Sequence, residues 1–305
     1  ERIRLDGVTY FPIDDRGAAT SRYLAGDLDL TDAFQLDDIG WLRERLQPGE
    51  LRLSPYFGTV MFGLLGSRPP FDSRPLRLAM NMAIDRDVLT GKLLRGVYLP
   101  AWNVVPPIPG YTPDLPEWAH WPAERRVARA RELYAEAGYS RERPLVVDIA
   151  FSIGDPDTTR TIEALSAMWR TTLGADVRLA GEDFRVLVQN RELAKHPLYW
   201  NAWIGDYPDP LAFLELLRGH SGQNFGKYDN PRFERLLEQA LDSSDDGERA
   251  GHYAAAERLL NDDAANLPVY FYQSRHLVKP VVRGWQDNPM DRQASRNLWL
   301  KRGEA

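Results

Sequence analysis

The segment from Trp203 to Pro210 places one carboxylate, that of Asp206, beside the aromatic rings of Trp203 and Tyr207. Its glycine and prolines do not suit the interior of a helix or strand, so the segment predicts a loop. An ionised aspartate attracts a positively charged amine, and an aromatic face can cover the neighbouring hydrocarbon or add a cation–π contact. The loop therefore predicts a site that binds a cation. An ordinary surface turn, in which the aspartate bonds only its own backbone, fits the same residues.

The sequence carries no motif of an enzyme. It has no G-x-S-x-G elbow, no H-E-x-x-H pair and no phosphate-binding loop. Its 5 histidines lack the spacing of metal ligands, and a chain with 0 cysteines makes no disulfide or thiolate site. Aspartate pairs such as Asp14-Asp15 fall in predicted turns or helix ends, where charge is normally solvated. We therefore expect a binding protein without catalytic activity, metal or cofactor.

Composition narrows the class of partner. The 305 residues are 43% hydrophobic and 27% charged, which suits two folding units with a sizeable core. The net charge is −6 and no run of five basic residues occurs, so we expect no nucleic-acid partner. No apolar run approaches the roughly 20 residues that span a bilayer, so we expect no direct membrane insertion. The first residues also lack the apolar region of a signal peptide, so we expect any export signal to lie upstream.

Strands and helices alternate around the predicted loop. Alternating or continuous apolar residues predict strands over 145–152, 176–179, 198–203 and 267–273. Helical spacing predicts helices over 123–137, 158–173, 184–191, 211–217, 231–241 and 248–262. The strand over 198–203 leads directly into the Asp206 loop. This rhythm predicts an α/β body with a parallel or mixed sheet.

The first part of the chain predicts a separate β-α-β unit. Residues Ile3 to Ile13 alternate like a strand, a helix follows over 18–25, and residues 28–30 alternate again. Further helices are predicted over 37–46, after Asp72-Ser73 and over 86–94, with extended segments over 51–53 and 59–65. The six prolines between 97 and 121 predict an ordered lid or rim segment. The strand-like end, 297–300, is expected to pair with the first strands.

In order and spacing, these motifs resemble the substrate-binding proteins of oligopeptide and dipeptide ABC transporters, solute-binding protein family 5. The resemblance runs from Ile3 to Lys301. The matching motifs are Arg22 to Asp29, Pro70 to Asp72 with Arg77, Ala83 to Arg86, Ala135 to Tyr139, Trp203 to Pro210, Tyr228 to Pro231, and Pro268 to Tyr272 followed by Leu277 to Pro280. Each motif alone is weakly specific, and their shared order carries the resemblance.

The resemblance implies a type II-like periplasmic-binding-protein fold, in which two α/β lobes enclose a peptide. It implies that Asp206 binds the α-ammonium group of that peptide and that Arg191 lines the cleft, where its donor fork could meet a carboxylate. A solvated helix arginine fits Arg191 equally well. Phe184 matches an aromatic that stacks on the peptide, and Tyr270 and Tyr272 fall on the hinge side. Core packing is the competing interpretation for these three aromatics.

Two departures from the family limit what the resemblance implies. Trp200 stands where a second cleft arginine is typical, so the length of the ligand and recognition of its carboxyl end do not carry over. The predicted ligand-binding residues are Asp206, Trp203, Tyr207, Arg191, Trp200, Phe184 and Tyr272. Family members also carry about a lobe of sequence before the match to Ile3. The resemblance therefore implies the carboxyl-terminal part of a receptor, with residues 58–272 as lobe II and residues 1–57 with 273–305 as the remnant of lobe I.

Two functions remain open for such a chain. One is the periplasmic or otherwise extracytoplasmic receptor of an ABC importer, which binds peptides or a similar amine-bearing ligand and docks on permease subunits. The other is the ligand-sensing domain of a transcriptional regulator, because receptor-like domains also occur fused behind DNA-binding domains. An enzyme is the least favoured reading, given the missing motifs.

Overall fold

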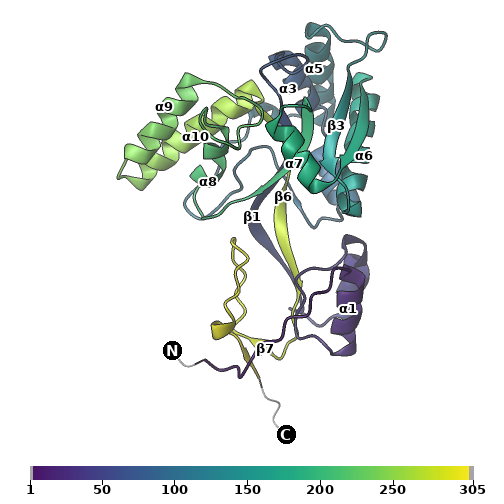
Figure 1. The fold of residues 1–305 in the computed structure, drawn as a ribbon, viewed down its shortest axis with the longest axis vertical. Coiled ribbons are helices and arrows are strands. Elements are labelled where there is room, and N and C mark those ends of the chain that lie inside the picture. The colour runs from purple at the N-terminus through teal and green to yellow at the C-terminus, as the bar shows by residue number, and fades with distance from the viewer. Residues whose placement is uncertain (1–2, 302–305) are drawn as a thin grey trace.

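Two bodies of unequal size lie at the ends of a long two-stranded ribbon in this computed structural model, which describes residues 3–301 (Figure 1). The large body comprises residues 65–265 with the adjoining halves of the two strands. The small body comprises residues 3–50 and 278–301 with the other halves. Within residues 3–301, no helix is both long and apolar enough to cross a bilayer.

A six-stranded mixed sheet organises the large body. The strands lie in the order β2 (Leu99–Pro100), β6 (Asn266–Leu277), β1 (Leu51–Leu64), β5 (Leu198–Ile204), β3 (Val146–Ser152) and β4 (Asp176–Glu182). β1 pairs antiparallel with both β5 and β6, whereas β3 runs parallel to β4 and β5. The sequence prediction of a parallel or mixed sheet is therefore confirmed.

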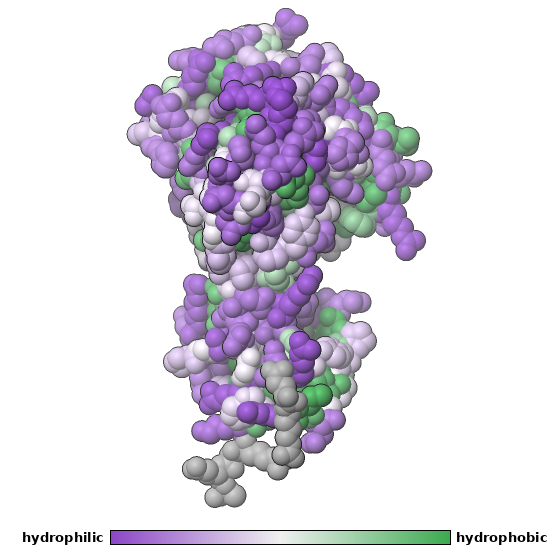
Figure 2. Space-filling view, turned by 90° about the vertical axis from the view of Figure 1, so that its left-hand side faces the viewer, coloured by the Kyte–Doolittle hydropathy of each residue, from purple (hydrophilic) through white to green (hydrophobic). Residues whose placement is uncertain are grey.

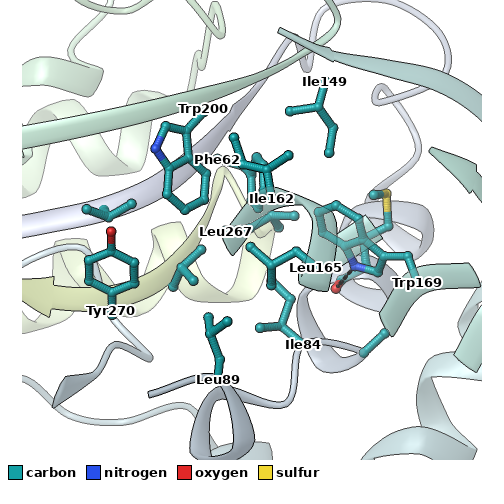
Figure 3. Close-up of a cluster of buried hydrophobic side chains, with 14 of the residues drawn as sticks. Phe62, Ile84, Leu89, Ile149, Ile162, Leu165, Trp169, Trp200, Leu267 and Tyr270 are labelled. Carbon is teal, nitrogen blue, oxygen red and sulfur yellow. Dashed lines mark hydrogen bonds between the residues drawn. The ribbon is translucent and has the colours of Figure 1, made fainter. Parts of the chain in front are cut away.

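Three helices, α3 (Arg74–Met82), α5 (Ala123–Glu136) and α6 (Pro156–Leu173), pack around the main core of this body. Its centre is aromatic: the Phe62 ring lies 5.1 Å from that of Trp169 and 5.0 Å from that of Trp200, between ring centroids (Figure 3). The Asp155 side chain accepts a hydrogen bond from the Thr158 amide at the start of α6, and Gly174 ends the helix in the left-handed region, φ 80°.

A second apolar cluster contains residues of α8 (Leu211–Leu214), α9 (Pro231–Asp242) and α10 (Asp246–Asp263). The helix α7 (Phe184–Glu192) directly precedes β5 in the chain. The middle of the proline-rich segment, residues 104–111, packs in this second cluster, while Tyr98, Trp102 and Trp118 pack in the main core. The segment is therefore ordered, as predicted. The buried carboxylate of Glu257 fixes it, accepting hydrogen bonds from the Val105 amide at 2.7 Å and the Tyr111 hydroxyl at 2.6 Å. The helix predicted over 86–94 divides into α4 (Arg86–Val88) and a π-helical turn, Leu89–Leu93.

The small body contains α1 (Arg16–Ala25), α2 (Ile39–Arg45) and a two-stranded sheet of β7 (Val282–Arg283) and β8 (Trp299–Leu300). The prediction of a strand over Ile3 to Ile13 was wrong, as was its pairing with the chain end. Residues 3–13 form no strand and β8 pairs with β7 instead. Alternation creates a strand only where a sheet edge offers hydrogen bonds, and Tyr10 remains 81% exposed. The strand predicted at 28–30 shrinks to one bridge, between Leu30 and Val278.

The ribbon joins what the sequence predicted as separate segments. β1 runs unbroken for 14 residues, although Pro55 lies inside it. β5 pairs with β1 only from Gly58 onward, so at Pro55 the strand has β6 alone as neighbour and the missing N–H faces an open edge. The register shifts between Pro55 and Thr59. Within residues 3–301 the chain passes between the two bodies only in β1 and β6 (Figure 1).

Candidate functional site

The loop that carries Asp206 begins where β5 ends at Ile204 and stops at α8. Gly205 is required at its start, because a Cβ there would lie 2.5 Å from the ring of Phe57. The Gly205 amide donates to the Phe57 carbonyl at 2.9 Å, and the Asp209 carboxylate accepts from the Leu211 amide at 2.9 Å. The predicted loop is confirmed, and its two ends are fixed by these contacts.

The Asp206 side chain is exposed, and no hydrogen bond or ion pair engages its carboxylate within the described part of the chain. Its backbone carbonyl accepts a bond from Arg292 Nη2 at 3.4 Å. The turn-forming hydrogen bond of the loop is instead made by Asp209. The carboxylate of Asp206 is thus a negative charge presented on a fixed backbone, which is what recognition of an ammonium group requires.

The two aromatic residues of the loop differ in environment. Tyr207 is 38% exposed and its hydroxyl donates to Glu215 Oε1 at 2.9 Å. Burial and that carboxylate raise the pKa of Tyr207, so the hydroxyl stays protonated. The Trp203 side chain is half-buried, and its buried Nε1 has no hydrogen-bond partner among residues 3–301. Trp203 therefore offers an unused donor immediately before the loop.

Behind Trp203 lies a small cavity of about 20 Å³, large enough for one water molecule. Its polar wall comes from Asn201, Gln223 and Asn266, and its apolar wall includes Met61 and Phe213. A water held there would give the Trp203 Nε1 an acceptor.

Arg191, near the end of α7, faces the same side of β5. Its Nη1 donates to Asn201 Oδ1 at 2.6 Å, and its guanidinium carbon lies 5.2 Å from the centroid of the Phe225 ring. Its Nε is buried and unpaired in the described structure, and burial lowers the pKa of the group. These contacts show a held, partly desolvated cation rather than a freely solvated helix arginine.

The remaining predicted residues lie elsewhere. Trp200 is on the opposite face of β5, where its ring lies 5.0 Å from Phe62 and 6.3 Å from Tyr270 in the main core (Figure 3). Phe184 is 61% exposed at the first position of α7. Tyr272 packs on the ribbon, with its ring 5.7 Å from that of Tyr98. The structure therefore places Trp203 and Arg191 next to Asn201 on one face of β5, and the Asp206 loop follows Trp203 along the chain. A ligand contact by Trp200 stays an untested prediction.

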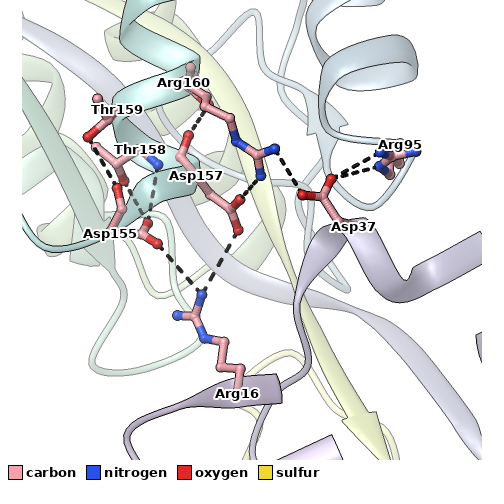
Figure 4. Close-up of polar contacts among 9 residues, drawn as sticks. Arg16, Asp37, Arg95, Asp155, Asp157, Thr158, Thr159 and Arg160 are labelled. Atoms are coloured by element: carbon pink, nitrogen blue, oxygen red, sulfur yellow. Dashed lines mark hydrogen bonds and ion pairs between the residues drawn. The ribbon is translucent and has the colours of Figure 1, made fainter. Parts of the chain in front are cut away.

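Sequence reasoning missed a charge network between the two bodies (Figure 4). Arg16 of α1 lies 3.6 Å from Asp155 and 4.0 Å from Asp157 at the start of α6. Asp37, the other residue from the small body, accepts from both Arg160 and Arg95 at 3.0 Å. The two bodies also share a cavity of about 610 Å³ lined by Asp14, Asp15, Arg16, Gln35, Leu36, Asp37, Gly154, Asp155, Pro156, Asp157 and Arg160.

No sequence signal identifies this network, because its partners lie far apart in the sequence, 58 positions for Asp37 and Arg95 and 123 positions for Asp37 and Arg160. Within residues 3–301, no group of three or more His, Cys, Asp or Glu side chains is placed to hold a metal ion.

The fold and the sequence together define the class of this protein. The sequence profile of the bacterial extracellular solute-binding proteins, family 5 Middle, matches residues 1–225. The chain belongs to this family. Its similarity to solved two-lobed periplasmic binding proteins confirms the predicted α/β fold class.

Among individual relatives, the periplasmic murein peptide-binding protein MppA of Escherichia coli is 32% identical over 298 residues, 97% of this chain and 55% of the relative. The periplasmic oligopeptide-binding protein OppA of Escherichia coli is 29% identical over 298 residues, with the same coverage. The solved MppA structure matches 95% of this chain and 57% of its own, with a TM-score of 0.86 and 31% identity. For Haemophilus influenzae OppA in complex with RPPGFSPFR, the TM-score is 0.83 at 28% identity, over 94% and 57%. The chain thus spans just over half the length of these relatives.

Proposed function

We propose that this chain is part of a peptide-binding receptor for an ABC importer, in which Asp206 binds the ammonium group of the ligand. The observation that carries the proposal is the exposed carboxylate on a fixed loop, which has no partner among the described residues and lies beside Tyr207 and Trp203 in the chain. The relatives support a peptide as ligand, since two are named peptide-binding proteins and one structure holds a peptide.

In this proposal, residues 58–272 form lobe II and residues 1–57 with 273–305 contribute to lobe I. The strand pairing supports this boundary. β5 pairs with β1 from Gly58 onward but not before it, and the register between β1 and β6 shifts between Pro55 and Thr59. Limited proteolysis should then cut the ribbon near Pro55 and Gln273 before it cuts either body. First cuts inside the six-stranded sheet would contradict the division.

Arg191 is the second charged contact of the proposed site. Its partly desolvated guanidinium has a buried Nε without a partner among residues 3–301, which suits a carboxylate or a carbonyl of the ligand. Tyr207, Phe184 and Tyr272 supply exposed or partly exposed aromatic surface that can cover ligand side chains. A ligand contact by Trp200 stays a prediction, and its ring packs in the core.

The receptor would work outside the cytoplasm and deliver its ligand to permease subunits, without catalysing a reaction. Two of the relatives described above are periplasmic binding proteins, which supports this location. No observation favours the alternative of a regulator's sensing domain.

The test compares wild type and Asp206→Asn in the full-length receptor, titrated calorimetrically with a peptide and its N-acetylated form. In this proposal the closed cleft of the full-length receptor encloses the pair of Asp206 and the ligand ammonium. Removing one member of such a buried pair costs about 3–5 kcal/mol, which weakens binding on the order of a hundredfold or more. Acetylation should weaken wild-type binding comparably and the variant little further, because both changes remove one interaction.

Asp229→Asn is the matched control, since Asp229 is an exposed loop aspartate of the same body. It should bind both peptides like wild type. Additive losses from the Asp206 substitution and acetylation would show that the carboxylate and the amine do not meet.

A further inference from the structure

Residues Trp285–Gln293, here called the strap, run from the small body along the ribbon towards the Asp206 loop (Figure 1). The Pro289 carbonyl accepts a hydrogen bond from the Phe57 amide at 2.7 Å, and Met290 packs against the cluster that holds Phe57. Arg292 donates to the backbone carbonyl of Asp206 at 3.4 Å. The Phe57 carbonyl in turn accepts from the Gly205 amide. The strap therefore contacts the Asp206 loop directly and through Phe57.

A buried histidine of β6, His276, also contacts the strap. His276 Nε2 lies 2.8 and 3.0 Å from the two carboxylate oxygens of Asp291, and Nδ1 lies 3.0 Å from the carbonyl oxygen of Thr31. The His276 ring also meets that of Trp285, with centroids 5.0 Å apart. His276 is 6% exposed, so water does not substitute freely for these partners.

Both ring nitrogens of His276 thus face groups that only accept hydrogen bonds. A neutral imidazole has one N–H, so it satisfies one of these partners and leaves the other without a donor. Only the imidazolium donates to both. The hydrogen-bond geometry therefore favours the charged form of His276.

Charges of both signs surround His276. Asp32 adds a second negative charge near the ring. Arg52, opposite His276 in the ladder, lies 3.5 Å from Asp287, and Arg292 extends towards the Asp206 loop. Burial alone lowers the pKa of His276, but the hydrogen bond and charge of Asp291 and the Thr31 carbonyl outweigh it, so the pKa is raised.

We propose that His276 and Asp291 are positioning residues, whose ion pair holds the strap against the Asp206 loop and so makes ligand affinity depend on pH. The inference rests on the proposed function of Asp206. Because the pKa of His276 in the folded protein is above its ordinary value of 6.5, the pair is fully formed below that pH. It is lost as pH rises through the raised value. Affinity should fall over the same interval.

The experiment measures calorimetric binding of RPPGFSPFR by the full-length receptor from pH 5.5 to 9, for wild type, Asp291→Asn and His276→Gln. Wild type should lose about tenfold in affinity above the histidine transition, on the scale of one charge-assisted pair. Both variants should already be weakened at pH 6 and show a flatter profile. The peptide's own amine, with an ordinary pKa near 8, titrates equally in all three proteins and cancels in the comparison.

Asp287→Asn is the control, because Asp287 lies on the same strap and contacts Trp285 and Arg52 rather than His276. It should keep the wild-type pH profile. A second measurement needs no ligand: amide hydrogen exchange of residues 285–293, corrected for the intrinsic rate, should accelerate at high pH in wild type and at all pH values in both His276 and Asp291 variants.

The outcomes separate the two proposals. If the receptor binds no peptide at any pH, both the proposed peptide-binding function and the proposed positioning role of His276 and Asp291 are overturned. Binding that depends on Asp206 but has the same pH profile in all variants overturns the positioning role alone. Strap exchange that responds to pH and to the substitutions, without any change in affinity, overturns it as well.

Discussion

Two aspartates in the loop after β5 have different tasks. Asp209 holds the backbone, accepting from the Leu211 amide at 2.9 Å, while Asp206 leaves its carboxylate exposed. The motif places both residues in a loop, but only the structure shows which carboxylate is engaged. The local spacing is equally compatible with either assignment, because both residues precede a short helix.

A substitution separates these roles. Asp209→Ala should lower the free energy of unfolding by about 1 kcal/mol, the usual cost of losing a side-chain acceptor at a helix start. Asp206→Asn should leave stability within about 0.5 kcal/mol of wild type, as is usual for a surface position. Chemical denaturation of the two variants measures this. Equal destabilisation by both would show that the Asp206 carboxylate also supports the fold.

Among the site residues, the sequence could predict position along the chain better than orientation. The alternation of β5 predicts a strand with Trp200 and Trp203 on opposite faces. It does not say which of the two faces meets a ligand. Long-range packing decides which face of the sheet each tryptophan occupies, and Trp200 packs against Phe62 and Tyr270 in the core. The partners of His276 were also out of reach, because Thr31 and Asp291 meet it only in three dimensions.

At the scale of elements, local signals predicted the helices of both bodies, α1 and α2 included, but not the strands of the small body. Caps and apolar periodicity located α5, α6, α9 and α10 to within a few residues. The segment Ile3 to Ile13 failed because strand formation depends on a partner that the segment itself does not contain. The same dependence on partners explains why β1 continues through Pro55, since β6 alone pairs with it there.

Segment 97–121 offers a test of how one buried carboxyl fixes an element. Burial raises the pKa of Glu257 to about 7 from an ordinary 4.5, although its hydrogen bonds act in the opposite direction. A raised folded-state pKa means that stability is present below 4.5 and lost as pH rises to about 7, by about 3 kcal/mol.

Glu257→Gln stays neutral and should remove this loss. The variant should unfold at a higher temperature than wild type at pH 8 and at a similar one at pH 4. Glu163→Gln, on the exposed side of α6, is the control and should keep the wild-type pH dependence. Thermal unfolding from pH 4 to 8 measures this difference. If the unfolding temperatures of wild type and Glu257→Gln change in parallel with pH, the buried carboxyl of Glu257 does not cause the loss of stability.

At the scale of the whole molecule, two strands, the contacts of the strap and a charge network (Figure 4) connect the bodies. Figure 2 shows the narrow waist between them. Asp37 joins the small body to both Arg160 and Arg95, and its side chain is 49% exposed. Exposed pairs contribute about 0.2–1 kcal/mol each, so the network biases the arrangement of the bodies without locking it.

Asp37→Asn should therefore widen the distribution of distances between the bodies, and about 1 M salt should do the same in wild type. Since the sequence has 0 cysteines, spin labels on Ser21→Cys and Glu163→Cys report this distance specifically. Asp38→Asn, next to Asp37 and outside the network, is the control. Unchanged distances in Asp37→Asn and in salt would show that the network does not bias the arrangement.

The pairing of Thr59 with Phe271 has a consequence for how such a molecule can be assembled. The chain between these two residues therefore begins and ends at adjacent positions on neighbouring strands, about 5 Å apart. Topologically, the large body is an insertion into a hairpin whose other end belongs to the small body. Domains with adjoining ends tolerate transplantation and circular permutation. A gene could therefore exchange the large body as a single contiguous segment while leaving the small body and its strap in place.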